Sequence, residues 1–182
     1  MRLFLISLCL FSTAQAQSFQ RLVDAQDVAA RFSSARQQLI VVTPVIDTKV
    51  VAEAIRRVAV ERGVNVFLLL APEFVEAPSS YGASLGALAG VQIRLANIDR
   101  SFALVDADQT AVVLEGALLG SGSAAFLTQE SYAITDEKVI SARSALFAET
   151  WEQAVPYISL VNRLEGPQLE PETLDLSILG GL

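Results

Sequence analysis

The sequence predicts an α/β fold in a single domain, and three observations support this. Residues 39–45 and 64–70 are continuous apolar runs, which is typical of strands buried on both faces of a sheet. An amphipathic segment lies between them and ends at Gly63, giving a strand–helix–strand unit of the parallel, right-handed kind. The 182 residues are 52% hydrophobic and 18% charged, which is enough for one packed core. We therefore expect a mostly parallel or mixed sheet flanked by helices.

Residues 1–16 have the pattern of a secretory signal peptide. A short positive start precedes an apolar run over residues 3–11, and Ala-Gln-Ala at 14–16 is a small-x-small cleavage site. The apolar run is too short to span a bilayer. We expect a mature chain that begins at Gln17, is secreted or periplasmic, and contains no transmembrane segment.

Charge and cysteine content narrow the chemistry of the mature chain. Cys9 is the single cysteine and lies in the expected leader, so neither a disulfide nor a thiol is predicted. The net charge of −7 becomes about −8 when Arg2 is removed with the leader. An acidic surface repels nucleic acid and anionic lipid, so no nucleic-acid partner is expected.

In chain order, a helix is predicted over residues 17–38 from its apolar spacing, followed by the strand at 39–45. Asp47 or Thr48 caps the next helix, which Gly63 ends. Beyond the strand at 64–70 we expect the following elements: a loop at 72–82, a short helix at 84–89, a half-buried strand at 91–96, strands at 102–105 and 111–114 joined by a polar turn, a strand at 131–135, and a helix from Asp136 to about 154. The domain is placed at 17–160 and a C-terminal tail at 161–182, with an apolar tip at 176–182.

Four segments in this order resemble a known family. They are Ile-Val-Val-Thr-Pro-Val-Ile at 40–46, the helix-to-strand join at 54–66 with Arg-Gly-Val-Asn-Val, Gly-Val-Gln-Ile-Arg at 90–94, and residues 130–136 followed by Phe147 and Trp151. Together they resemble a single phospholipase D-like domain, the half-unit of a superfamily that also includes phosphatidyltransferases and small bacterial endonucleases. The resemblance covers roughly residues 20–155 and implies the fold. Family members pair two halves, which implies a homodimer or a heterodimer with a histidine-bearing half as the partner.

The family's defining motif is degenerate in this chain. That motif is His-x-Lys-x-x-x-x-Asp followed by a Gly-Ser-x-Asn turn, and its histidines, lysine and asparagine attack, protonate and hold the phosphoryl group. With Asp106 on the motif aspartate, the histidine position falls on Asp99 and the lysine position on Ser101. The chain contains no histidine. The turn aligns with residues 116–119 or 120–123, and neither has the asparagine, so no catalytic residue of the family type is expected.

Two other uses of these acids stay open. Asp99, Asp106 and Asp108 are weak candidates for a divalent cation site, and Asp99 is a candidate carboxylate nucleophile. Capping of strand ends and turns is the simpler interpretation of all three. Four further residues are candidates for binding a ligand: Arg100, Ser121, Ser123 and Glu130.

The predicted function is a phospholipase D-like pseudoenzyme that serves as a binding or scaffold module without a cofactor. One alternative is a metal- or aspartate-dependent phosphodiesterase or phospholipase that uses Asp99, Asp106 and Asp108. The other is an inactive half that a partner phospholipase D-like chain completes.

Overall fold

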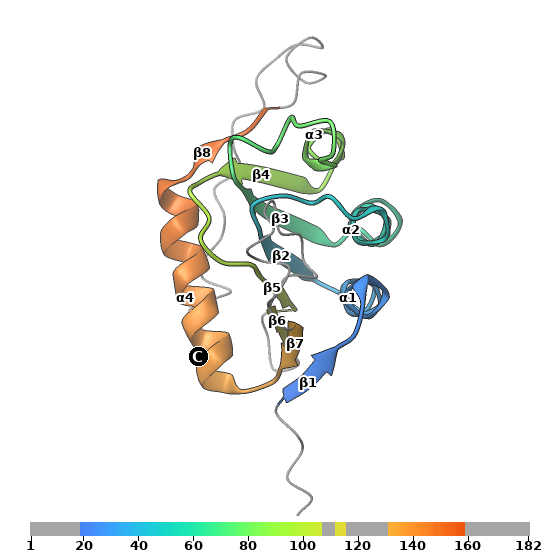
Figure 1. Cartoon of the computed structure of the whole chain (residues 1–182), viewed down its shortest axis with the longest axis vertical. Coiled ribbons are helices and arrows are strands. Elements are labelled where there is room, and N and C mark those ends of the chain that lie inside the picture. Colours follow the sequence, from blue (N-terminus) through green and yellow to red (C-terminus); the bar gives the residue numbers. More distant parts are fainter. Residues whose placement is uncertain (1–18, 107–111, 116–130, 159–182) are drawn as a thin grey trace, which may run out of the picture.

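A mixed sheet forms the centre of the protein, and helices cover both of its faces (Figure 1). The computed structural model describes residues 19–106, 112–115 and 131–158, and all elements below lie in these ranges. In the described part the sheet has eight strands in the order β1-β7-β6-β5-β2-β3-β4-β8. The strands are β1 (Phe19–Leu22), β2 (Gln38–Val42), β3 (Asn65–Leu70), β4 (Val91–Leu95), β5 (Phe102–Val105), β6 (Val112–Glu115), β7 (Ser131–Ile134) and β8 (Val155–Pro156). The helices are α1 (Ala25–Phe32), α2 (Lys49–Arg62), α3 (Gly82–Leu85) and α4 (Glu137–Gln153).

The expected α/β fold with a mixed sheet is confirmed. Parallel pairing is confined to the neighbours β2, β3 and β4, which the strand–helix–strand pattern predicted. The other pairings are antiparallel, including β5 against β2 with Val42 opposite Phe102. Consequently the loop before β5 lies beside the carboxyl end of β2, and the end of β5 lies beside the start of β2.

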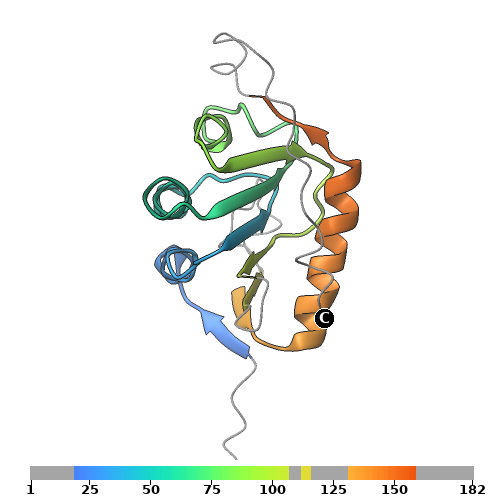
Figure 2. The same cartoon turned by 180° about the vertical axis from the view of Figure 1, so that it is seen from behind.

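The two faces of the sheet carry separate apolar clusters. Helices α1, α2 and α3 lie side by side on one face, and α4 runs along the other (Figures 1 and 2). The cluster under α4 includes Phe67, Phe102, Phe147 and Trp151. The rings of Trp151 and Phe67 pack edge to face, with their centroids 5.5 Å apart. Because both faces are covered, β2 and β3 are apolar and buried after their first residues, Gln38 and Asn65.

The helix predicted at residues 17–38 is much shorter in the structure, where α1 spans only Ala25–Phe32. Residues 19–22 form β1, which pairs antiparallel with β7 so that Phe19 lies opposite Ile134. Asp24 has an extended backbone and accepts hydrogen bonds from the backbone N–H groups of Gln26 and Asp27, and it thereby starts α1. Pairing with a strand more than a hundred residues away overrides the local helical spacing. The short strand β8 was also not predicted.

Several predicted boundaries hold. Thr48 is the N-cap residue of α2, and Gly63 ends the helix with φ 67°, a left-handed conformation that suits glycine. Asp136 caps α4 through bonds from the backbone N–H groups of Lys138 and Val139. The expected leader at 1–16 and the tail at 161–182 lie outside the described residues. Within the described ranges, no helix has the length and apolar character needed to cross a membrane.

Candidate functional site

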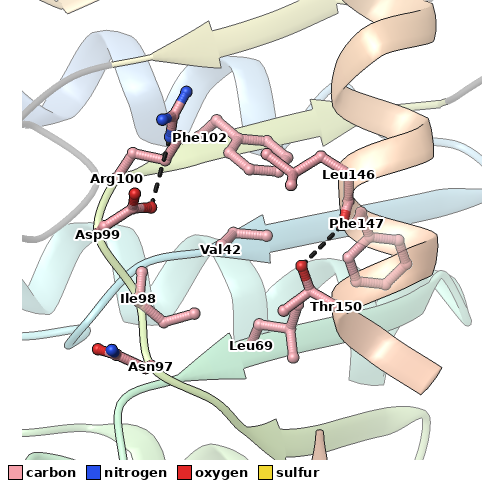
Figure 3. Close-up of a pocket in the computed structure, with 10 residues that line it drawn as sticks. All are labelled: Val42, Leu69, Asn97, Ile98, Asp99, Arg100, Phe102, Leu146, Phe147 and Thr150. Atoms are coloured by element: carbon pink, nitrogen blue, oxygen red, sulfur yellow. Dashed lines mark hydrogen bonds and ion pairs between the residues drawn. The ribbon is translucent and has the colours of Figure 1, made fainter. Parts of the chain in front are cut away.

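A small pocket lies beside Asp99 and Arg100, at the end of the sheet where β5 begins. It opens between the loop that precedes β5 and one side of α4, above the carboxyl ends of β2 and β3 (Figure 3). Its cavity volume is about 40 Å³. A buried water needs about 10–15 Å³ on this measure, so the pocket has room for roughly three. The lining residues are Val42, Leu69, Asn97, Ile98, Asp99, Arg100, Phe102, Leu146, Phe147 and Thr150.

Asp99 and Arg100 form the charged rim of this pocket. The Asp99 carboxylate accepts a hydrogen bond from Arg100 Nε at 3.4 Å. The side chains are 81% and 54% exposed respectively, so water screens the pair and it contributes little to stability. Asp99 is thus a solvated carboxylate, and its negative charge repels a phosphodiester.

Ser101, at the motif lysine position, is buried. Its Oγ lies 3.2 Å from Thr43 Oγ1, and Thr43 in turn donates to the carbonyl oxygen of Val45 at 3.1 Å. Either hydroxyl of the Thr43–Ser101 pair can donate the hydrogen. The bond joins the end of β2 to the start of β5. Ser101 is only 6% exposed and uncharged, so it offers no cation to a ligand.

Asp106, at the motif aspartate position, serves the backbone. Its carboxylate accepts hydrogen bonds from the N–H groups of Arg36, Gln37 and Gln38 at 2.8–3.1 Å. Asp106 has φ 47°, and it is the single non-glycine residue with a positive φ in the described ranges. Aspartate tolerates this conformation better than most residues. The side chain fixes the turn that leads from α1 into β2, so it is a structural anchor.

The cation site proposed from Asp99, Asp106 and Asp108 is contradicted for the two residues that the structure describes. Asp99 precedes β5 and Asp106 follows it, so the two residues lie at opposite ends of this strand. A four-residue strand alone spans roughly 13 Å, which exceeds what one cation can bridge. Asp108 lies outside the described residues. Among the described residues, no three His, Cys, Asp or Glu side chains group closely enough to hold a metal ion.

One charged pair near the pocket was not predicted. Arg143 on α4 donates from Nε to Glu115 Oε1 at 2.5 Å, and its guanidinium lies 5.6 Å from the centroid of the Phe102 ring. Glu115 is directly opposite Phe102 in the sheet, which brings this pair beside the pocket. Both side chains are less than a third exposed. The pairing joins residues 28 apart in sequence, and no local pattern reveals it.

The remaining candidates divide into two groups. Arg100 lies on the pocket rim, as described above. Ser121, Ser123 and Glu130 lie outside the described residues, as do both alignments of the Gly-Ser turn at 116–123.

Comparison with solved structures identifies the fold. NucT from Helicobacter pylori superposes with a TM-score of 0.64 at 18% identity, covering 77% of this chain and 98% of NucT. Nuc from Salmonella typhimurium, a phospholipase D family member, gives a TM-score of 0.55 at 18% identity, covering 72% of this chain and 89% of Nuc. The archaeal chromatin protein TrmBL2, whose structure shows a mode of DNA binding, gives 0.54 at 15% identity, covering 81% of this chain and 57% of TrmBL2.

The chain therefore has the phospholipase D-like fold, as the order of its sequence segments indicated. No protein-family model matches the sequence, and no curated protein matches it significantly. The structural likeness extends over nearly the whole of NucT, so this chain contains one complete unit of the fold. At 15–18% identity these neighbours establish the architecture alone.

Proposed function

We propose that this chain is a secreted or periplasmic phospholipase D-like pseudoenzyme, a binding or scaffold module that does not hydrolyse phosphodiesters. The observation that carries the proposal is the state of the three motif positions. Asp99 is a solvated carboxylate, Ser101 is buried against Thr43, and Asp106 is bonded to three backbone N–H groups. Hydrolysis by the family mechanism requires a nucleophile, a phosphate-binding cation and an acid that protonates the leaving oxygen. Asp99, Ser101 and Asp106 supply none of these groups.

Export is part of the proposal and rests on the leader pattern at residues 1–16. Expression of the full chain in a bacterial host, followed by cell fractionation and intact mass measurement, tests it. A periplasmic or secreted protein with the mass of a chain that starts at Gln17 is expected. A cytoplasmic protein that retains Met1 would contradict export.

An activity assay tests the catalytic half of the proposal. The purified chain is incubated with a chromogenic phosphodiester in the presence of EDTA, Mg²⁺, Mn²⁺ or Ca²⁺, and the expected rate equals the buffer blank in each case. Asp99→Asn is the matched variant, because its side chain is exposed and its loss leaves the fold unchanged. Metal-dependent turnover that Asp99→Asn abolishes would overturn the pseudoenzyme proposal in favour of an aspartate-dependent phosphodiesterase.

Partner binding separates the remaining alternatives. Sedimentation of the chain alone measures whether it forms a homodimer, and mixing it with a histidine-bearing phospholipase D-like half measures whether a heterodimer gains activity. The acidic net charge opposes binding to nucleic acid, whereas the structural neighbour TrmBL2 is itself a DNA-binding chromatin protein. Fluorescence anisotropy with labelled duplex DNA is expected to show no binding, and saturable binding would place nucleic acid among the partners.

A further inference from the structure

The pocket between the loop before β5 and α4 has an apolar floor with a narrow charged rim. Six of its ten lining residues are apolar, and Leu69, Phe102 and Phe147 at the floor are at most 1% exposed. Only Asn97, Asp99 and Arg100 stand exposed at the mouth. Space for roughly three waters, at about 30 Å³ of liquid volume each, matches the bulk of one leucine or isoleucine side chain. The pocket therefore fits a single aliphatic anchor rather than a large ligand.

The chain itself carries a segment with such anchors. Residues 174–182 read Leu-Asp-Leu-Ser-Ile-Leu-Gly-Gly-Leu, with five aliphatic side chains and one acid. Superposition on NucT covers 98% of that protein but only 77% of this chain, or about 140 of its 182 residues. The fold is thus complete without roughly 40 residues of this chain, close to the number in residues 1–18 and 159–182 together.

The geometry allows this segment to reach the pocket. Thr150 lines the pocket and lies three residues, about 4.5 Å along the helix axis, before the end of α4 at Gln153. β8 follows α4 directly and pairs with β4, and the described chain ends at Ile158. The 16 residues from there to Leu174 extend to about 53 Å at most, well beyond the length of α4. Connection through the same chain raises the effective concentration of the segment to the millimolar range.

We infer that residues 174–182 dock on this pocket, with one aliphatic side chain seated between Ile98 and Leu146 and with Asp175 beside Arg100. Within the described part of the chain, Arg100 pairs only with the neighbouring Asp99, at 3.4 Å, so the guanidinium has further donors to offer. The Asp99 carboxylate repels that of Asp175, so the aliphatic contact supplies most of the attraction. The docked segment covers the edge of the sheet at which Asp99 stands. The inference is independent of whether the domain hydrolyses a substrate.

Energy transfer from the single tryptophan tests the docking. Trp151 packs against Phe147 of the pocket with ring centroids 5.2 Å apart, and it is the only tryptophan in the chain. A chain starting at Gln17 has no cysteine, so Ser177→Cys provides one site for a thiol-reactive dansyl acceptor. Strong transfer from Trp151, independent of protein concentration, is expected. Transfer that rises with concentration would mean that a second copy occupies the pocket, and it would overturn the intramolecular assignment.

Paired variants identify the aliphatic contact. Ile178→Asp with Leu179→Asp removes two adjacent aliphatic side chains of the five, whereas Gln168→Asp with Thr173→Asp adds the same charge and keeps all five. Burial of one aliphatic side chain corresponds to roughly a ten- to hundredfold ratio of docked to free segment, which the first pair should abolish and the second should retain. Equal transfer in both pairs would overturn the inference.

Hydrogen exchange gives a readout without the label. Residues 97–100 should exchange faster after Ile178→Asp with Leu179→Asp, and the amides of β3 should not change. Unaltered exchange at 97–100 would also overturn the inference. A circular dichroism spectrum of each variant verifies that the domain remains folded.

Discussion

Replacing Asp106 tests most directly whether the motif aspartate is structural. In Asp106→Ala the N–H groups of residues 36–38 lose an acceptor that the structure places at 2.8–3.1 Å. Asp106 is only 7% exposed, so water cannot easily take the place of its carboxylate as the acceptor of these hydrogen bonds. At about 1 kcal/mol for each of three bonds, the loss is about 3 kcal/mol. Alanine at φ 47° adds about 1 kcal/mol more.

Urea unfolding followed by the fluorescence of Trp151 measures this loss, because that side chain is 2% exposed in the folded protein. We expect a free energy of unfolding about 3–4 kcal/mol below that of the parent chain for Asp106→Ala. Asp106→Asn should lose about 1–2 kcal/mol, since the amide oxygen still accepts and asparagine tolerates a positive φ.

Asp99→Ala is the matched control, with a carboxylate that is 81% exposed in the parent protein. Its free energy of unfolding should change by less than about 0.5 kcal/mol. A loss below about 1 kcal/mol for Asp106→Ala, or equal losses for the two variants, would refute the assignment of Asp106 as an anchor of the backbone.

Two further substitutions test how helices end in this fold. Arg94 Nη1 donates to the carbonyl oxygen of Trp151 at 2.6 Å, and its guanidinium lies 4.8 Å from the centroid of that ring, in the last turn of a helix that has no basic residue there. Arg94→Met should lower the free energy of unfolding by about 1–3 kcal/mol in urea, with Arg94→Lys intermediate; equal values for the two would show that the charge plays no part. Gly63 has φ 67° and no atom within 4 Å of a Cβ built on it, so Gly63→Ala should cost about 1 kcal/mol through the backbone alone. In thermal melts, the stability of Gly63→Asn should lie between that of the parent and that of Gly63→Ala. A Gly63→Ala protein as stable as the parent would contradict this.

Local patterns predicted most of the elements because most of them are decided locally. The predicted strand at 102–105 matches β5 residue for residue, and a buried, continuous apolar run leaves few alternatives. Asp136 and Gly63 mark helix ends through their own side-chain and backbone preferences. Residues 19–22 were assigned to a helix because the partner that makes them a strand, β7, is remote in sequence.

The sequence predicted where the residues of the candidate site lie along the chain, but it did not predict their hydrogen bonds and ion pairs. The spacing of the motif placed Asp99, Ser101 and Asp106 around β5, and the structure agrees. That Asp106 binds the backbone of residues 36–38, almost 70 positions away, depends on the antiparallel pairing of β2 with β5. The Glu115–Arg143 pair likewise requires the register of β6 and the path of α4. Such contacts are set by tertiary structure, and sequence spacing carries no trace of them.

The burial of Ser101 means that the packing at this position suits a small side chain. A lysine at this position would have to bring an ammonium group into a site where the residue is 6% exposed and hydrogen-bonded to a fully buried Thr43. Burying a charge without a partner costs several kcal/mol, unless the loop before β5 moves away from β2. Placing a lysine at position 101 would therefore strain the contact between the end of β2 and the start of β5. The hydroxyl groups of Thr43 and Ser101 close this end of the sheet, and the Asp99 carboxylate stands in solvent beside them.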